Sequence, residues 1–203
     1  LDTIKNIDYP DRHEMCDRFD LDQEKKLIIF LQHPVTTEVK NIEKDIDESI
    51  QALECIKKTY NPNIVAVYSN HDAGGRRIIS ALKQAGIRIS PHIVYEEFLR
   101  LLNVADVLVG NSSTGIHEAP SFGLPTVNIG SRQQHRERGC NVIDVENNAD
   151  AIYSSIEKSL ADADFIRTVK QGKNPYDNGD TAVQVVDILE KVKLPEVQKV
   201  ISY

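Results

Sequence analysis

Hydrophobic positions along the chain form short continuous runs that alternate with longer segments of helical spacing. The apolar runs are rich in strand-forming residues and lie at 27–31, 64–67, 87–89, 107–109, 126–129 and 142–145. Continuous runs, in place of strictly alternating patterns, indicate strands that are buried on both faces of a parallel sheet. The pattern therefore predicts about six strands.

Helical spacing fills the segments between these runs. Apolar residues recur every three or four positions from Ile42 to Ile56, which marks one face of a helix. Further helices are predicted at 76–84, 96–103, 115–122, 149–160 and 182–192. Strands that alternate with helices predict an α/β fold with a doubly wound, Rossmann-like parallel sheet.

The beginning of the chain has a different character. Residues 1–24 are polar and rich in Asp, so we expect them to be a linker or lead-in from a preceding N-terminal domain. Residues 25–203 are then expected to form the sheet domain. The first residue is Leu1 and not Met, which suggests a piece of a longer protein.

Composition narrows the function classes. Of 203 residues, 40% are hydrophobic and 27% charged, with a formal net charge of −7, which argues against a general nucleic-acid binder. No apolar run approaches the roughly 20 residues of a membrane span, and no signal peptide opens the sequence. Three widely spaced cysteines fit reduced thiols. We therefore expect a cytoplasmic protein with no membrane partner.

Several common site signatures are missing. The sequence has no GxGxxG or GxxxxGK phosphate motif and no GxSxG nucleophile motif. The six histidines are scattered without metal-ligand spacing, so we expect no metal and no cofactor.

Polar side chains gather after the predicted strands. In an open parallel sheet, ligands bind outside the carboxyl ends of the strands. The loops at that edge carry His33, then Asn70 and Asp72, then Asn111, Ser112 and Ser113, then Arg132, Gln133 and Arg136. A structural His and turn-forming Asn and Asp are the alternatives for the first two loops. This edge is nevertheless predicted to bind a polar ligand.

The segment GNSSTGIHEAPSFG, residues 110–123, is the strongest local motif. A strand enters hydroxyl residues and a glycine, and then a helix begins, which is an arrangement that binds anions. Ser112 and Ser113 offer hydroxyl donors, and Gly115 would let a phosphate approach the backbone. Ordinary helix capping by Ser remains the alternative.

A cluster of three arginines and one histidine follows at residues 132–138 of this otherwise acidic chain. The planar guanidinium of Arg suits phosphate oxygens, so Arg132 and Arg136 are candidate phosphate ligands. A solvated charge cluster is the alternative.

Four ordered blocks, HPVTTE, SNHDAGG, GNSSTGIHEAPSFGLPTVNIGSRQ and RERGCNVI, resemble the hydrolysing UDP-N-acetylglucosamine 2-epimerases. The resemblance spans roughly residues 25–190 and covers the C-terminal half of that family's GT-B-like two-domain fold. It implies UDP-N-acetylglucosamine or a related UDP-sugar as ligand, a separate N-terminal domain, and a homo-oligomeric whole protein.

The resemblance also implies roles for individual residues. Ser112 and Ser113 match the serines that hold the diphosphate, and Arg132 matches a phosphate-side arginine. His33 matches a histidine near the diphosphate that would help UDP to leave.

The other implied contacts lie around the nucleoside. Glu118 matches the carboxylate that binds the ribose, Tyr95 an aromatic near the uracil, and Asn70 and Asp72 a loop of the nucleotide pocket. The segment 174–180, NPYDNGD, departs from the family's NPYGDGN.

The implied reaction removes the C2 proton of the sugar, eliminates UDP and adds water to the glycal, which releases N-acetylmannosamine. No close carboxylate pair stands at the predicted edge, so we expect the chain alone to be inactive. Three alternatives remain open: a GT-B glycosyltransferase donor domain, a non-hydrolysing 2-epimerase, and a non-catalytic sugar-nucleotide-binding module.

Overall fold

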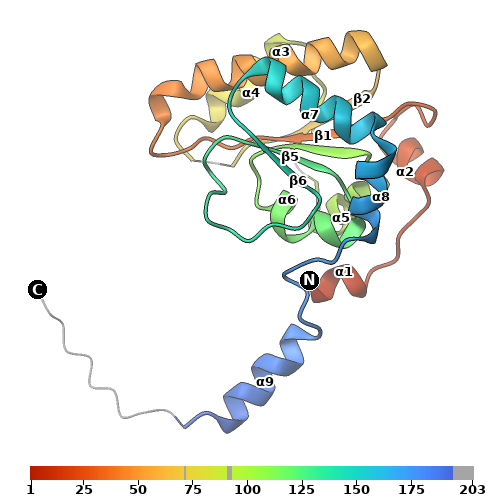
Figure 1. Cartoon of the computed structure of the whole chain (residues 1–203), viewed down its shortest axis with the longest axis vertical. Coiled ribbons are helices and arrows are strands. Elements are labelled where there is room, and N and C mark those ends of the chain that lie inside the picture. Colours follow the sequence, from red (N-terminus) through yellow and green to blue (C-terminus); the bar gives the residue numbers. More distant parts are fainter. Residues whose placement is uncertain (71, 91–92, 194–203) are drawn as a thin grey trace, which may run out of the picture.

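Six strands pair into one parallel sheet in a computed structural model that describes residues 1–70, 72–90 and 93–193 (Figure 1). The strand order is β3-β2-β1-β4-β5-β6, which is the order of a doubly wound nucleotide-binding sheet. The strands are β1 (Leu27–Leu31), β2 (Asn63–Val67), β3 (Ile89–Ser90), β4 (Val107–Gly110), β5 (Thr126–Ile129) and β6 (Val142–Val145). The predicted fold class is confirmed, with the third strand two residues later than expected.

Helices connect the strands and cover the sheet. They are α1 (Asp2–Lys5), α2 (Arg12–Arg18), α3 (Ile42–Tyr60), α4 (Gly75–Gln84), α5 (Tyr95–Val104), α6 (Thr114–His117), α7 (Ala149–Ala161), α8 (Ala163–Gln171) and α9 (Thr181–Lys191), with 3-10 turns η1 (Val39–Asn41) and η2 (Ala119–Phe122). The helix predicted at 115–122 is in fact two short turns, α6 and η2, because Pro120 cannot continue an α-helix that needs its N–H. The helix α8 was not predicted, although Asp162 caps it through the N–H groups of Asp164 and Phe165.

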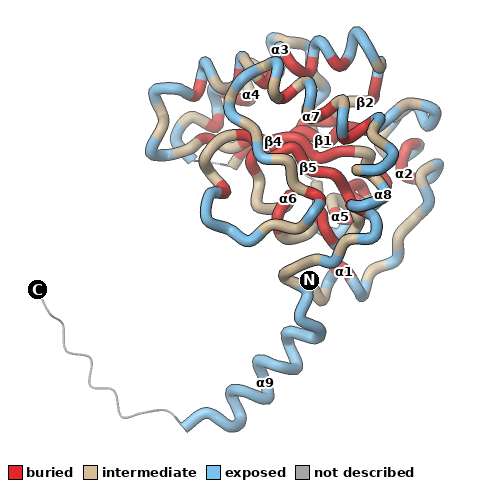
Figure 2. Tube along the Cα trace, viewed as in Figure 1, coloured by how far each residue is buried: buried red, intermediate tan, exposed pale blue. Residues whose placement is uncertain are grey.

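Both faces of the sheet are buried, as the continuous apolar runs require. Ile28 and Phe30 face a core that α3, α4 and α7 complete, whereas Ile29 and Leu31 face a second core completed mainly by α5. All five residues of β1 are buried. Figure 2 shows this buried centre between exposed helix faces.

The order of the strands fixes the ligand edge. Chain connections run from β1 outward through β2 to β3, and then return to β4 on the other side of β1. Loops that leave β1 and β4 therefore diverge, and the crevice between them is where such sheets bind ligands.

The lead-in segment 1–24 has more structure than the sequence suggested. Its helices α1 and α2 pack on the second core through Ile4 and Met15, and Met15 is fully buried. Asp11 caps α2 by accepting a hydrogen bond from the N–H of Glu14. The domain boundary at residue 25 remains a prediction, and residues 194–203 of the predicted domain lie outside the described part.

The C-terminal helix α9 stands apart from the sheet and is exposed along its whole length (Figure 2). Apolar side chains on it are open to solvent, among them Ile188 at 62% and Leu189 at 66% exposure. Its first N–H groups, from Thr181 and Ala182, donate to the carboxylate of Asp2, which fixes the base of the helix.

Replacing Met15 by Ala tests whether α2 is part of the folded domain. A fully buried Met whose removal leaves a cavity costs about 2–5 kcal/mol of unfolding free energy. His13→Ala is the matched control, because the His13 side chain on the same helix is 66% exposed and we expect a change within about 0.5 kcal/mol. Urea unfolding measures both; equal stabilities would show that α2 does not pack on the core.

Candidate functional site

The buried side chain of Asn111 joins the loops that follow β1 and β4. Its Oδ1 accepts from the His33 N–H at 2.7 Å, and its Nδ2 donates to the His33 carbonyl at 2.8 Å. Its own carbonyl accepts from Arg132 Nη1 at 3.1 Å and from Gln133 Nε2 at 2.8 Å. Asn111 is only 3% exposed, and its hydrogen bonds align three loops; the ligand contact predicted for it stays a prediction.

The imidazole of His33 is fixed in orientation and in tautomer. Its Nδ1 accepts the backbone N–H of Asn70 at 3.0 Å, so the proton of the neutral ring is on Nε2. Burial, and then the charge of Arg132, lower the pKa of His33 to about 4, while Asp72 opposes the shift. At neutral pH the ring is therefore an uncharged N–H donor.

The two serines differ in their local bonds. Ser112 Oγ lies 3.3 Å from the Thr114 N–H, a weak capping contact. Ser113 precedes α6 directly, but its side chain makes no capping hydrogen bond. The capping alternative thus applies in part to Ser112 and leaves the Ser113 hydroxyl available. Because α6 has only four residues, its dipole adds little, and the expected helix N-terminus is a weak contributor.

Gly115 is required for packing. A Cβ at this position would lie 2.4 Å from Cγ2 of Thr126 on β5. The missing side chain therefore lets α6 approach the sheet. The expected close approach of a phosphate at Gly115 remains a prediction.

The arginine loop, residues 131–139, carries three guanidinium groups with different roles. One holds the loop in place, and the other two lie at the edge of the sheet. Arg138 binds Asp144 on β6 through two N–H donors, at 2.6 and 3.1 Å, and also bonds the carbonyls of Gln133 and Arg136. Gln133 is 1% exposed and supports Asn111. Among the described residues, the guanidinium groups of Arg132 and Arg136, in contrast, each make one hydrogen bond, which leaves further N–H donors. Burial, partly offset by Asp72, and the nearby charge of Arg136 lower the pKa of Arg132.

The remaining predicted residues lie on both sides of these cations. Asn70 Nδ2 donates to Asp72 at 2.5 Å, which holds the loop after β2 beside His33. Tyr95 begins α5 and is 47% exposed; burial and the charge of Glu118 raise its pKa. One carboxylate oxygen of Glu118 is buried and has no hydrogen-bond partner among the residues that the structure describes. The predicted residues from separate loops therefore belong to one continuous edge.

His117 was given no role from the sequence, yet it touches this edge. Its Nε2 lies 3.0 Å from Nη1 of Arg136, and its ring packs edge-on against Tyr176 with centroids 4.6 Å apart. Nothing in the residue order signalled this contact, because Tyr176 lies about 60 positions along the chain.

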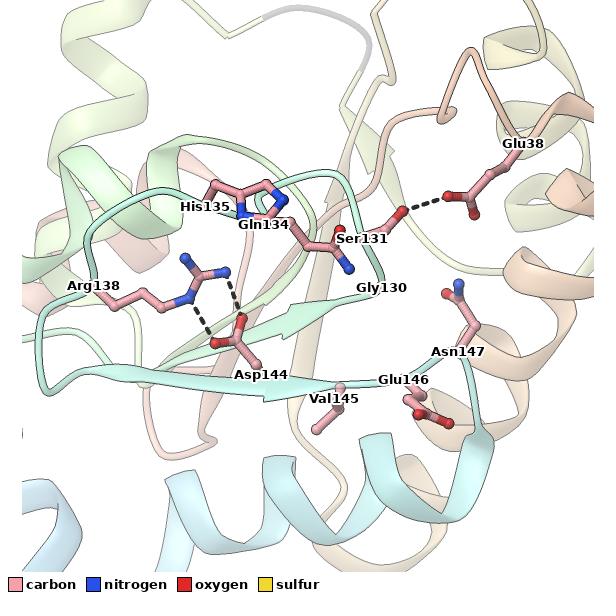
Figure 3. Close-up of a pocket in the computed structure, with 10 residues that line it drawn as sticks. All are labelled: Glu38, Gly130, Ser131, Gln134, His135, Arg138, Asp144, Val145, Glu146 and Asn147. Atoms are coloured by element: carbon pink, nitrogen blue, oxygen red, sulfur yellow. Dashed lines mark hydrogen bonds and ion pairs between the residues drawn. The ribbon is translucent and has the colours of Figure 1, made fainter.

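A pocket of about 570 Å³ opens beside this edge, at the ends of β5 and β6 (Figure 3). Its walls include Glu38, Ser131, His135, Asp144 and Glu146, and none of the predicted site residues. Figure 3 shows the Arg138–Asp144 pair on one side and the Ser131–Glu38 hydrogen bond on the other. Most of its charged groups are already paired or acidic, so this pocket does not favour an anion.

Within residues 1–70, 72–90 and 93–193, no group of three or more His, Cys, Asp or Glu is arranged to hold a metal ion. No helix in these ranges combines the length and hydropathy needed to cross a membrane.

The fold is a doubly wound α/β domain with polar and cationic side chains at the carboxyl edge of its sheet. The profile of the UDP-N-acetylglucosamine 2-epimerase family matches residues 2–190, and the chain belongs to that family.

Relatives refine the comparison. The chain is 34% identical to a hydrolysing UDP-N,N′-diacetylbacillosamine 2-epimerase of Legionella pneumophila, over 96% of this chain and 50% of that protein. It is 31% identical to a UDP-N-acetylglucosamine 2-epimerase of Neisseria meningitidis, over 97% and 50%. The chain thus spans about half the length of these curated relatives.

A solved structure shares the fold. The UDP-GlcNAc 2-epimerase from Neisseria meningitidis bound to UDP-GlcNAc superposes with a TM-score of 0.72 at 19% identity, covering 89% of this chain and 49% of that one.

The protonation of His33 is directly testable. We expect a neutral Nε2–H tautomer with a pKa of about 4, measured by NMR of the imidazole nitrogens and assigned with His33→Gln. Because the folded pKa lies below the ordinary 6.5, the unfolded state binds more protons between pH 6.5 and 4. The unfolding free energy of the wild type should therefore fall relative to His33→Gln as the pH drops through that window. An ordinary pKa with a charged ring at pH 6 would contradict the fixed tautomer.

Proposed function

We propose that this chain binds the diphosphate of a UDP-sugar at the crevice between β1 and β4. The observation that carries the proposal is the pair Arg132 and Arg136, which lie close enough to affect each other and keep unused donors in a chain of net charge −7. Two neighbouring cations favour a bound anion, although the carboxylate of Asp72 also acts on Arg132. The family membership supports the same ligand class.

The neutral donors complete this anion site. His33 would donate its Nε2–H to a phosphate oxygen, since Nδ1 is already occupied by Asn70. Ser113 would donate its free hydroxyl. These donors carry no charge, so they add hydrogen bonds without adding repulsion between cations.

The nucleoside would extend toward α5. The unpartnered carboxylate oxygen of Glu118 suits a ribose hydroxyl, and exposed Tyr95 offers a ring for the uracil. Asn70 and Asp72 would line the pocket. Asn111 and Gln133 were expected to contact the ligand; because both side chains are buried, they would instead support the loops that carry the donors.

The proposed reaction is that of a hydrolysing 2-epimerase, in which UDP leaves and water adds to the sugar. This chain would stabilise the charge on the departing diphosphate. A base for the C2 proton would come from a second domain, and the relatives, which are about twice as long as this chain, have room for one. The exposed apolar face of α9 gives such a domain a surface to cover. Assembly into a homo-oligomer and a cytoplasmic location belong to the same proposal.

The names of two relatives support a class of sugar. One hydrolysing relative is named for a diacetamido sugar nucleotide and another relative for UDP-N-acetylglucosamine. We propose a UDP-linked 2-acetamido sugar, the class these names share. A protein that retains UDP on its product would instead be a non-hydrolysing epimerase, and release of free UDP from the substrate distinguishes the two.

Titration with UDP, followed by NMR to millimolar ligand, tests the anion site. Arg132→Ala should weaken binding about tenfold to hundredfold, because a hydrogen bond to a charged group contributes about 1.5–3 kcal/mol. Ser113→Ala should weaken it by about tenfold or less.

Arg167→Ala is the charge-matched control, since Arg167 lies on α8 with 65% of its side chain exposed. It should leave the affinity unchanged. Failure of the wild type to show saturable shifts, or equal affinity in all variants, would overturn the proposed site.

A further inference from the structure

A turn formed by residues late in the sequence is hydrogen-bonded to the arginine loop. The turn spans residues 174–177 and is closed by a hydrogen bond from the Asp177 N–H to the Asn174 carbonyl at 3.1 Å. Asn174 Oδ1 accepts the Tyr176 N–H at 2.9 Å, which shapes the turn from within. This is the segment in which the sequence departs from the family pattern.

The turn reaches the site through two separate contacts. Asn174 Nδ2 donates to the carbonyl of His117 and to Ser121 Oγ, each at 2.7 Å. The hydroxyl of Tyr176 donates to the carbonyl of Glu137 in the arginine loop at 3.1 Å. The turn therefore holds α6 and the arginine loop at a fixed separation.

His117 is the last residue of α6 and contacts both the turn and the arginine loop. Its backbone carbonyl is held by Asn174, its ring packs against Tyr176, and its Nε2 lies 3.0 Å from Nη1 of Arg136. Arg136 can only donate, so Nε2 must be the unprotonated acceptor. The ring is thus a neutral acceptor that directs the Arg136 side chain.

Holding the Arg136 side chain in one orientation matters for binding because this side chain is exposed. A long, unrestrained side chain loses rotamer freedom when it binds a ligand, and that loss opposes binding. A side chain already held in place loses less. We propose that His117 and Tyr176 are positioning residues that hold Arg136 ready for the anion, an inference that rests on the proposed UDP site.

The arrangement is sensitive to protonation. The groups that face the His117 ring are Arg136 from the arginine loop, Glu118 from its own segment and Tyr176 from the turn. Burial, and then the charge of Arg136, lower the pKa of His117, so the ring remains an acceptor at neutral pH. Protonation would remove the acceptor and set two cations against each other.

A double-mutant cycle on UDP affinity tests the inference. His117→Phe removes the acceptor and should weaken UDP binding about threefold to tenfold, the range for one hydrogen bond. In the Arg136→Ala background the same substitution should have no further effect, because the group that His117 positions is gone. In the Arg132→Ala background its effect should persist.

Two further variants separate positioning from general damage to the fold. His117→Gln restores an acceptor that does not titrate and should bind UDP nearly as the wild type does at neutral pH. As the pH falls below 6.5, wild-type affinity should drop relative to His117→Gln, and the ligand's own titration cancels in that ratio. Tyr176→Phe keeps the ring but loses the bond to Glu137, and should weaken binding only while Arg136 is present.

The outcomes distinguish this inference from the proposed function. If Arg132→Ala weakens UDP binding but Arg136→Ala does not, the anion site stands and the positioning role is overturned. If the His117→Phe effect is undiminished in the Arg136→Ala background, or the ratio to His117→Gln is independent of pH, positioning is also overturned. If neither Arg132→Ala nor Arg136→Ala changes the affinity for UDP, the proposed function itself is overturned. Thermal unfolding of each variant checks that it folds.

Discussion

The hydrogen-bonded pair between the Asn111 amide and the main chain of His33 is the constraint on which the site depends. It ties together the two loops that follow β1 and β4, the central neighbouring strands of the sheet. The carbonyl of the same residue then receives Arg132 and Gln133 from a third loop. A buried amide with these partners holds its loops firmly, because any slip would leave polar groups without bonds.

The electrostatics follow from that framework. His33 is kept neutral by burial and by the charge of Arg132, so the edge has a donor with no added charge. Two arginines are brought near one another, while the third, Arg138, is neutralised by Asp144 and fixes the loop. A positive centre thus stands on a chain that is acidic overall. Local arrangement, and not net charge, determines which ligand such a surface favours.

The N-terminal segment packs on the core and also contacts α9 and the turn at residues 174–177. The segment 1–24 supplies helices to the core, and Asp2 also accepts the first N–H groups of α9. Lys5 pairs with Asp177 at 2.7 Å, next to the turn that reaches the arginine loop. The site is therefore connected, through packed and hydrogen-bonded elements, to the exposed helix that we propose meets a second domain.

The sequence by itself determined the fold class and the set of loops at the ligand edge. Buried parallel strands require continuous apolar runs, and a parallel sheet places its polar loops on one side, so His33, Ser113 and Arg132 could be grouped from spacing alone. Only the tertiary structure decided which of the side chains at this edge are buried, packed or paired. Asn111 and Gln133 are buried and hydrogen-bonded between loops, Gly115 packs against Thr126, and Arg138 is paired with Asp144. His117 and Tyr176 meet only after folding, because contacts between residues far apart in the chain are set by how elements pack and not by local pattern.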